Sequence, residues 1–236
     1  EFVNFVTLIP QDGYLIACTD YDNIKEIIKN GSCNIETYGF QGECSYRISK
    51  YKNCDFGLEF SIIDNGTIID GFKTSQLGTH NLLNILSAYA ISKRAGIKLE
   101  KIKSAILTFK GVKRRLEVRG ISNNITVIDD FAHHPTAVLE TIKAVRMKYP
   151  SSRIWAIFEP RTNTTRRNVL MNDLGNSFNS ADKIIIAKVF KPEVIEPERR
   201  LDVTKLIKMI KDNNKEALYI PDTEEIVSLI KREANP

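Results

Sequence analysis

Four polar side chains follow directly after a short apolar run near the middle of the chain. Residues 129–135 read Asp-Asp-Phe-Ala-His-His-Pro, and the run at 125–128 is Ile-Thr-Val-Ile. This order predicts a strand, then a turn with two carboxylates and two imidazoles, then a helix that begins at Pro135. In α/β sheets, ligands bind at the carboxyl ends of the strands. The stretch is therefore the first candidate for a ligand site.

A carboxylate in this turn can accept hydrogen bonds from both hydroxyls of a ribose. The N–H groups and the positive dipole end at the start of the following helix suit a phosphate group. The simpler alternative is that Asp130 or His134 only caps that helix. We favour the nucleotide interpretation, because capping needs one such residue and this turn has four.

A second group consists of His80, Asn81 and Asn84, which share one face of the first turn of a helix predicted over 80–94. An amide side chain both donates and accepts hydrogen bonds, which suits the edge of a nucleobase. The alternative is an asparagine N-cap beside a surface histidine. Spacing alone gives the two interpretations equal weight.

Two basic segments are further candidates. Lys113-Arg114-Arg115 adjoins a predicted domain joint at 110–112, where a forked guanidinium can clamp phosphates, although a solvated basic turn fits equally well. The second segment, 158–167, follows a strand predicted over 153–158 and precedes a helix predicted over 166–179. Its arginines, hydroxyls and amide suit a carboxylate-bearing substrate. The alternative is a polar loop with a threonine cap.

One segment resembles a phosphate-binding loop without meeting its requirements. Residues 66–74 read G-x-x-x-x-G-F-K-T, which places one residue too many before Lys73. The same segment begins with Asn65-Gly66 between two strand-like runs, which is a strong hairpin signal. We therefore predict a hairpin here, and we find no other phosphate-loop candidate in the sequence.

The composition is that of an ordinary globular protein, with 236 residues, 42% hydrophobic and 27% charged. No apolar run reaches the roughly 18 residues of a membrane span, and no signal peptide is present. The net charge of +5 is dispersed among acidic residues, so we expect no nucleic-acid partner, whereas an anionic small substrate fits. The spacing of the four cysteines fits no metal site, which predicts free thiols in a cytoplasmic protein.

The hydrophobic pattern predicts α/β folding in two parts. In the first part, Leu83, Leu86, Ala90 and Ile91 give the helix over 80–94 its apolar face. The second part alternates strands and helices as a doubly wound domain. The first part is predicted to contain strands at 13–18 and 34–38, helices at 1–9 and 22–29, an antiparallel meander over 44–73, and helices at 80–94 and 99–109. The second is predicted to contain strands at 125–128, 153–158, 183–187 and 217–220 and helices at 135–149, 166–179, 203–211 and 223–232.

Three motifs resemble, in order and spacing, those of the Mur ligase family. They are residues 78–84 (Gly-Thr-His-Asn-Leu-Leu-Asn), residues 109–117 (Phe-Lys-Gly-Val-Lys-Arg-Arg-Leu-Glu) and residues 129–135. These enzymes are ATP-dependent ligases that join amino acids or peptides to UDP-N-acetylmuramic acid. The resemblance extends over essentially the whole chain.

The resemblance implies a fold and an extent. Residues 1–110 are expected to be the C-terminal part of the central ATP-binding domain, a mixed sheet with helices. Residues 111–236 are expected to be the Rossmann-like C-terminal domain, with its last strand beyond residue 236. The family's phosphate loop and its Mg²⁺ ligands would precede residue 1. No metal ligand is therefore expected within the chain, and the fragment alone is expected to be inactive.

The resemblance also implies roles for individual residues. ATP would phosphorylate the lactyl carboxylate of the sugar, and the incoming amine would then attack the acyl phosphate. No obligate protein partner is indicated. The residues implied at the ATP site are His80, Asn81 and Asn84 near the adenine, Arg115 reaching toward ATP, Asp130 at the ribose and His133 nearby, with Arg115, Asp130 and His133 as the catalytic group. The residues implied at the substrate carboxylates are Arg161, Asn163 and Arg166.

Within the family, the loop after residue 158 narrows the substrate. Its Phe-Glu-Pro-Arg sequence, with Asn163 and the pair Arg166-Arg167, resembles murein peptide ligases. Those enzymes join the tripeptide L-alanyl-γ-D-glutamyl-meso-diaminopimelate to UDP-N-acetylmuramate in cell-wall recycling, whereas relatives that add L-alanine have Gln-Pro-His-Arg in this loop. We therefore predict a tripeptide ligase. The alternatives are a UDP-N-acetylmuramate–L-alanine ligase and a nucleotide-binding module without catalysis.

Overall fold

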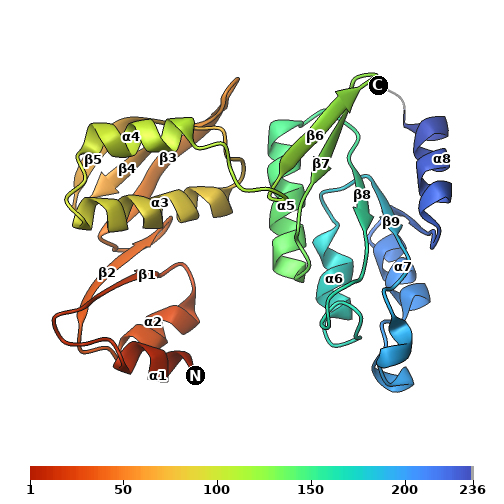
Figure 1. Cartoon of the computed structure of the whole chain (residues 1–236), viewed down its shortest axis with the longest axis horizontal. Helices are drawn as coiled ribbons and strands as arrows, with labels where there is room; N and C mark the ends of the chain where they lie inside the picture. The colour runs from red at the N-terminus through yellow and green to blue at the C-terminus, as the bar shows by residue number, and fades with distance from the viewer. Residues whose placement is uncertain (235–236) are drawn as a thin grey trace. The chain divides into compact units, whose positions relative to one another are not determined.

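The computed structural model describes residues 1–234, which form two compact units (Figure 1). The first unit is Glu1–Lys110, and the second begins at Gly111. Residues 235 and 236, the end of the C-terminal domain expected over 111–236, lie outside the described residues. The first unit has one sheet and the second has two, and each unit has its own buried apolar residues. Across residues 1–234, no helix combines the length and the apolar character needed to cross a membrane.

The first unit contains a mixed five-stranded sheet in the order β1-β2-β3-β4-β5. The first three strands pair in parallel, and the last three pair antiparallel as a meander. The strands are β1 (Tyr14–Cys18), β2 (Asn34–Gly39), β3 (Tyr46–Cys54), β4 (Gly57–Asp64) and β5 (Thr67–Thr74), and the helices are α1 (Phe2–Thr7), α2 (Asp22–Ile28), α3 (Thr79–Arg94) and α4 (Leu99–Thr108).

The predicted hairpin is confirmed between β4 and β5. Asn65 and Gly66 have φ values of 46° and 87°. Two successive residues with positive φ form the turn whose twist matches that of the flanking strands, which is why Asn-Gly is favoured there. The segment that resembles a phosphate loop therefore lies in a hairpin and strand β5, with no helix start after its lysine.

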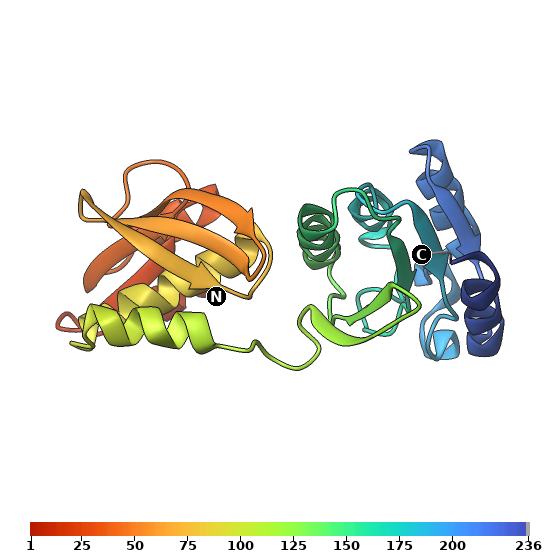
Figure 2. The same ribbon diagram turned by 90° about the horizontal axis from the view of Figure 1, so that it is seen from above.

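Helices α3 and α4 lie along one face of the strands (Figures 1 and 2). The buried face of α3 includes Leu82, Leu86 and Tyr89. The prediction of Ile91 on the buried face is wrong, because its side chain is 57% exposed. The packed face of α3 is therefore centred on Leu82 and Tyr89 rather than on Leu83 and Ile91.

A buried carboxylate ties α3 to the end of β4. Asp64 accepts hydrogen bonds from Tyr89 Oη at 2.6 Å and from Lys93 Nζ at 2.6 Å. Burial alone raises the pKa of Asp64, but the hydrogen bonds from Lys93 and Tyr89 outweigh it and hold that pKa below its ordinary value. Asp64 is therefore ionised at neutral pH, and it belongs to the scaffold of the first unit.

The second unit contains two sheets. A parallel three-stranded sheet has the order β10-β9-β8, and an antiparallel pair joins β6 to β7. The strands are β6 (Glu117–Ser122), β7 (Ile125–Asp129), β8 (Trp155–Phe158), β9 (Lys183–Ile186) and β10 (Glu216–Tyr219), the helices are α5 (Pro135–Lys148), α6 (Met171–Ser177), α7 (Val203–Asp212) and α8 (Thr223–Glu233), and two 3₁₀ turns are η1 (Pro192–Val194) and η2 (Pro197–Arg199).

Strand β9 is buried on both faces, as a central strand of a parallel sheet should be. Ile184 and Ile186 pack in a core shared with α5, α6 and α7, whereas Ile185 packs against α8. Because successive side chains of a strand alternate between faces, the run Ile-Ile-Ile fills both cores at once. Helices therefore cover both faces of the sheet, in agreement with the predicted α/β layering.

Two local predictions in this unit need correction. Strand β6 was not predicted, because most of its side chains are exposed and show no apolar alternation. The helix predicted over 166–179 is confirmed only over Met171–Ser177. Residues before it are held by a bridge between Arg167 and Arg200 and by a hydrogen bond from Leu201 N to Arg166 O, contacts that a helical backbone there could not make.

Candidate functional site

The carboxylate of Asp130 organises the turn that follows β7. Its Oδ2 accepts a hydrogen bond from Leu116 N at 2.7 Å, and its Oδ1 accepts from Ala132 N at 2.7 Å and from Thr141 Oγ1 at 3.2 Å. A carboxylate offers about four acceptor positions. Three of them are therefore used internally, and the position that remains, on Oδ2, suits one ribose hydroxyl rather than two.

His134 acts as the N-cap of α5, which was the simpler alternative for this turn. Its Nδ1 accepts a hydrogen bond from Thr136 N at 3.3 Å, and Pro135 occupies the first turn of the helix. Asp130 does not cap the helix, because its bond to Thr141 lies beyond the first turn. The two residues thus differ: His134 caps the start of α5, whereas Asp130 joins the turn to Leu116, just before β6, and to Thr141 in α5.

The structure places the basic segment at 113–115 beside this turn. The guanidinium carbons of Arg114 and Arg115 lie 5.0 and 5.8 Å from the ring centroid of Phe131. The His133 ring packs edge-on against the same phenyl ring at 5.0 Å, and His133 Nδ1 lies 2.9 Å from Phe131 O. Phe131 is 44% exposed. An exposed ring with two cations and an imidazole is suited to a nucleotide, since it offers stacking surface and phosphate donors together.

Backbone strain marks the segment that presents these arginines. Arg114 and Leu116 have φ values of 58° and 49°, in the left-handed region that is uncommon for residues other than glycine. Arg114 O accepts from Phe131 N at 2.8 Å, and Arg114 N donates to Glu117 Oε2 at 2.8 Å. These bonds, with the one from Leu116 to Asp130, hold the conformation. The contacts of Arg114 and Arg115 with Phe131 leave no signal in the sequence, because all three residues are exposed and each arginine lies at least 16 residues before the ring.

The loop after β8 presents Arg161 from a different position. Arg161 is 62% exposed; its guanidinium lies 4.4 Å from the Phe190 ring centroid and 3.4 Å from Glu159 Oε1. Of the other two residues predicted for this site, Arg166 donates to the carbonyl groups of Phe190 and Lys191, each at 3.3 Å. Asn163 Oδ1 accepts from Arg167 Nε at 3.3 Å. Of these three side chains, Arg161 is therefore the most available to a ligand.

In the first unit, the residues predicted to bind the base lie at the start of α3. The N-cap is Gly78 (φ 87°), so the alternative of an asparagine N-cap is wrong. Asn81 Nδ2 donates to Leu77 O at 2.8 Å, and Asn84 Nδ2 donates to Asn81 Oδ1 at 3.2 Å. The Nδ1 atom of His80 is buried. The amide of Asn84 is exposed and retains a free oxygen acceptor, which is the chemistry that a base edge requires.

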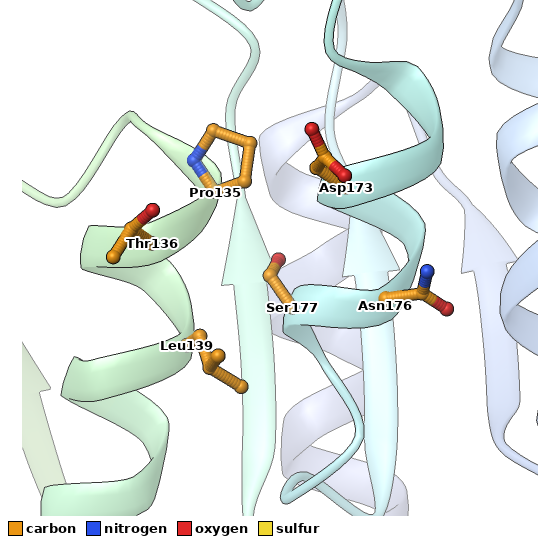
Figure 3. Close-up of a pocket in the computed structure, with 6 residues that line it drawn as sticks. All are labelled: Pro135, Thr136, Leu139, Asp173, Asn176 and Ser177. Carbon is orange, nitrogen blue, oxygen red and sulfur yellow. The ribbon is translucent and has the colours of Figure 1, made fainter. Parts of the chain in front are cut away.

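A depression of about 240 Å³ lies between α5 and α6 (Figure 3). It is lined by Pro135, Thr136, Leu139, Asp173, Asn176 and Ser177. None of the predicted site residues lines it, so it is a neighbour of the turn after β7 rather than part of it. Within residues 1–234, no group of three or more histidine, cysteine, aspartate or glutamate residues is arranged to hold a metal ion.

Comparison with protein families gives two matches that together span most of the sequence. Residues 114–236 match the Mur ligase, glutamate ligase domain, and residues 1–92 match the Mur ligase middle domain. The chain belongs to the Mur ligase family. Among relatives of this Mur ligase chain, a UDP-N-acetylmuramate–L-alanine ligase of Acetivibrio thermocellus is 34% identical over 242 aligned residues, which cover all of the chain and 50% of that protein. The chain thus spans about half the length of the curated relatives it matches.

Solved structures of similar fold include three ligases. A UDP-N-acetylmuramate–alanine ligase of Thermotoga maritima has a TM-score of 0.73 at 21% identity, covering 92% of this chain and 45% of that one. A murein peptide ligase of Psychrobacter arcticus has a TM-score of 0.69 at 24% identity, with 99% and 48% covered. A MurF ligase of Thermotoga maritima in complex with ADP has a TM-score of 0.64 at 14% identity, with 98% and 56% covered. At these identities the likeness shows the shared Mur ligase fold.

Proposed function

We propose that the protein containing this chain is an ATP-dependent ligase that joins L-alanine to UDP-N-acetylmuramate. The observation that carries the proposal is the 34% identity, along the entire chain, with a ligase of that activity. The exposed cations Arg114, which packs against Phe131 in the turn after β7, and Arg161, in the loop after β8, agree with it, because every substrate of the reaction is anionic or bears a carboxylate.

In this proposal, each unit has its own residues with a role toward ATP. His80, Asn81 and Asn84 contact the adenine, and Asp130 accepts one ribose hydroxyl through its remaining acceptor position. Arg115 neutralises phosphate charge, with His133 beside it against Phe131. The MurF ligase structure that contains ADP supports a nucleotide in this fold.

The second part of the proposal concerns the amine substrate. Arg161 pairs with its carboxylate, and Asn163 and Arg166 hold the loop in shape. Catalysis then consists mainly of positioning and charge neutralisation, as an acyl phosphate forms on the sugar's lactyl carboxylate and the amine attacks it. Within residues 1–234, no group of three or more histidine, cysteine, aspartate or glutamate side chains is arranged to hold the Mg²⁺ that accompanies ATP in this proposal.

A tripeptide ligase remains as a second candidate because of one loop. Residues 158–161 read Phe-Glu-Pro-Arg, the sequence that predicted a murein peptide ligase, and a murein peptide ligase is among the structures of similar fold. The comparison with sequence relatives does not support that first choice. It supports the L-alanine ligase, which the sequence analysis carried as an alternative.

The decisive assay uses the protein expressed from its complete reading frame with ATP, Mg²⁺ and UDP-N-acetylmuramate. L-alanine and the tripeptide are supplied in parallel, and the product mass and phosphate release are measured. We expect L-alanine to give the higher kcat/KM. A higher value for the tripeptide would replace the proposal by the second candidate, and no product with either amine would overturn both.

Asp130→Asn tests the ribose role. The amide keeps one acceptor oxygen but loses the charge, so we expect the KM for ATP to rise about ten-fold while the KM for L-alanine changes less than about two-fold. Asp212→Asn, at an exposed position of α7, is the matched control. Equal increases for ATP and L-alanine would show that Asp130 only maintains the turn.

A further inference from the structure

Phe190, in the loop after β9, contacts Arg161, in the loop after the neighbouring strand β8. It lies four residues beyond the end of β9, and its ring carries the guanidinium of Arg161, from the loop after β8, at 4.4 Å. Lys191 Nζ lies 5.4 Å from the same ring. Strands β8 and β9 pair in parallel, so both loops leave the carboxyl edge of the sheet, where α/β proteins bind ligands.

The backbone around Phe190 is fixed independently of its ring. Phe190 N donates to Pro160 O at 3.0 Å, and Arg166 Nη1 donates to Phe190 O and to Lys191 O, each at 3.3 Å. Lys191 has a left-handed backbone with a φ of 44°. Removing the ring therefore leaves these main-chain contacts in place, and the effect of the ring on its two cations can be measured separately.

The ring is the main contact that orients Arg161. This guanidinium also lies 3.4 Å from Glu159 Oε1, and the side chains of Arg161 and Glu159 are both exposed. Exposed ion pairs add little, because water screens them. A guanidinium whose carbon lies over the face of an aromatic ring, as that of Arg161 does at 4.4 Å, makes no hydrogen bond to the ring and so keeps its N–H groups available for a carboxylate. The positive charge of Arg161 thus remains available while its position is restricted.

We propose that Phe190 is a positioning residue that holds Arg161, with Lys191 beside it, ready to bind the carboxylate of the incoming amine substrate. The inference rests on the proposed ligase function, because that function supplies the carboxylate. It adds a residue that the sequence motifs did not single out, and it assigns the loop after β9 a part in substrate affinity. Phe190 itself makes no polar contact with the substrate.

The test compares Phe190→Leu with Phe190→Tyr in the protein expressed from its complete reading frame. Leucine keeps an apolar side chain but removes the ring, so we expect the KM for the amine substrate to rise about five-fold, with kcat and the KM for ATP within about two-fold. Tyrosine keeps the ring and should restore the wild-type KM. An unchanged KM in Phe190→Leu, or a tyrosine variant as impaired as the leucine variant, would overturn the proposal.

A second measurement does not depend on turnover. The NMR signal of the Arg161 Nε–Hε group should report a restricted side chain in the wild-type protein and in Phe190→Tyr, and a mobile one in Phe190→Leu. If Arg161 is equally mobile in all three proteins, the positioning role is wrong even where ligation is observed. If Arg161 is restricted but neither amine is ligated, the positioning holds and the proposed function fails.

Discussion

The two edges of the parallel sheet in the second unit each present a cation beside an aromatic ring. The cation at one edge is buried and paired with two carboxylates, whereas the cation at the other edge is exposed. At the amino edge, Lys183 Nζ lies 4.6 Å from the Trp155 ring centroid, and its charge is met by Glu216 at 2.5 Å and Glu233 at 2.7 Å. At the carboxyl edge, Arg161 lies against Phe190 with a single, exposed carboxylate at 3.4 Å.

The difference separates structural charge from available charge. Lys183 is 2% exposed, so its ammonium group must be neutralised within the protein, and the strand register brings Trp155, Lys183 and Glu216 into one row to do so. Arg161 is 62% exposed and keeps most of its hydrogen-bonding capacity. We infer that the amino edge holds the sheet to α8, whereas the carboxyl edge is free to bind a ligand.

The largest expected effect is on stability, at the amino edge. Lys183→Ala removes the buried stem and leaves Glu216 and Glu233 without their shared cation, so we expect the free energy of unfolding to fall by about 3 kcal/mol. Trp155, the only tryptophan in the sequence, reports the transition by fluorescence during urea unfolding. Lys208→Ala, at an exposed position of α7, should change it by less than about 0.5 kcal/mol. Similar losses in both variants would remove the distinction between the edges.

The next effect is on substrate affinity, at the carboxyl edge. Arg161→Ala should raise the KM for the amine substrate about 10- to 100-fold through loss of a charge-assisted hydrogen bond, with little change in the urea midpoint. Arg199→Ala, at an exposed position in η2, is the control. An Arg161 variant that loses stability and keeps its KM would place Arg161 with the structural charges.

A smaller effect is the pH dependence of stability. Burial lowers the pKa of Lys183, but the hydrogen bonds that Lys183 donates to Glu216 and Glu233 outweigh it, so that pKa is raised above its ordinary value of 10.5. The contribution of the Lys183 charge to the free energy of unfolding is therefore fully present below pH 10.5. It is lost as the pH rises through the pKa that Lys183 has in the folded state. We expect Trp155-monitored stability to fall above pH 10.5 more in the wild type than in Lys183→Ala. Parallel pH profiles for the two proteins would contradict this.

The smallest effect is expected for Glu216→Gln. The amide keeps an acceptor for Lys183, and Glu233 still supplies a negative charge, so the loss should stay below about 1 kcal/mol. The variant should also begin its alkaline loss of stability at a lower pH than the wild type, because less negative charge supports the lysine. Urea unfolding at pH 7 and pH 10 measures both changes, and a loss as large as that of Lys183→Ala would show that Glu233 contributes nothing.

Local sequence signals were enough for most elements of the fold. The Asn65-Gly66 turn and the helix start at Pro135 depend on backbone preferences of a few adjacent residues, and both are found as predicted. Strand β6 was missed because most of its side chains are exposed and show no apolar alternation. The segment 166–170 was missed because Arg200 and Leu201, more than 30 residues further along the chain, determine its backbone. Val118 and Ile121 pair with β7 while remaining exposed, and Arg167 pairs with Arg200.

The candidate site divides in the same way. The sequence predicted Asp130, His133, Arg115 and Arg161 as candidate site residues, and the structure shows that Arg115 and His133 both pack against Phe131. The sequence analysis did not identify Phe131 or Phe190 as the rings against which these cations pack. An exposed phenylalanine carries no periodic signal, and its role depends on which loop lies beside it.

The sequence by itself determined most of the strands and helices, the Asn-Gly hairpin and the three motifs that resemble Mur ligases, because these depend on neighbouring residues. Only the tertiary structure decided which charged groups are neutralised by partners within the protein and which remain exposed to a ligand. Asp130 has three of its acceptor positions filled by groups from separate segments, Lys183 is neutralised by two carboxylates, and Arg161 keeps its charge. Such differences depend on burial and on partners distant in sequence, which residue type and spacing do not encode.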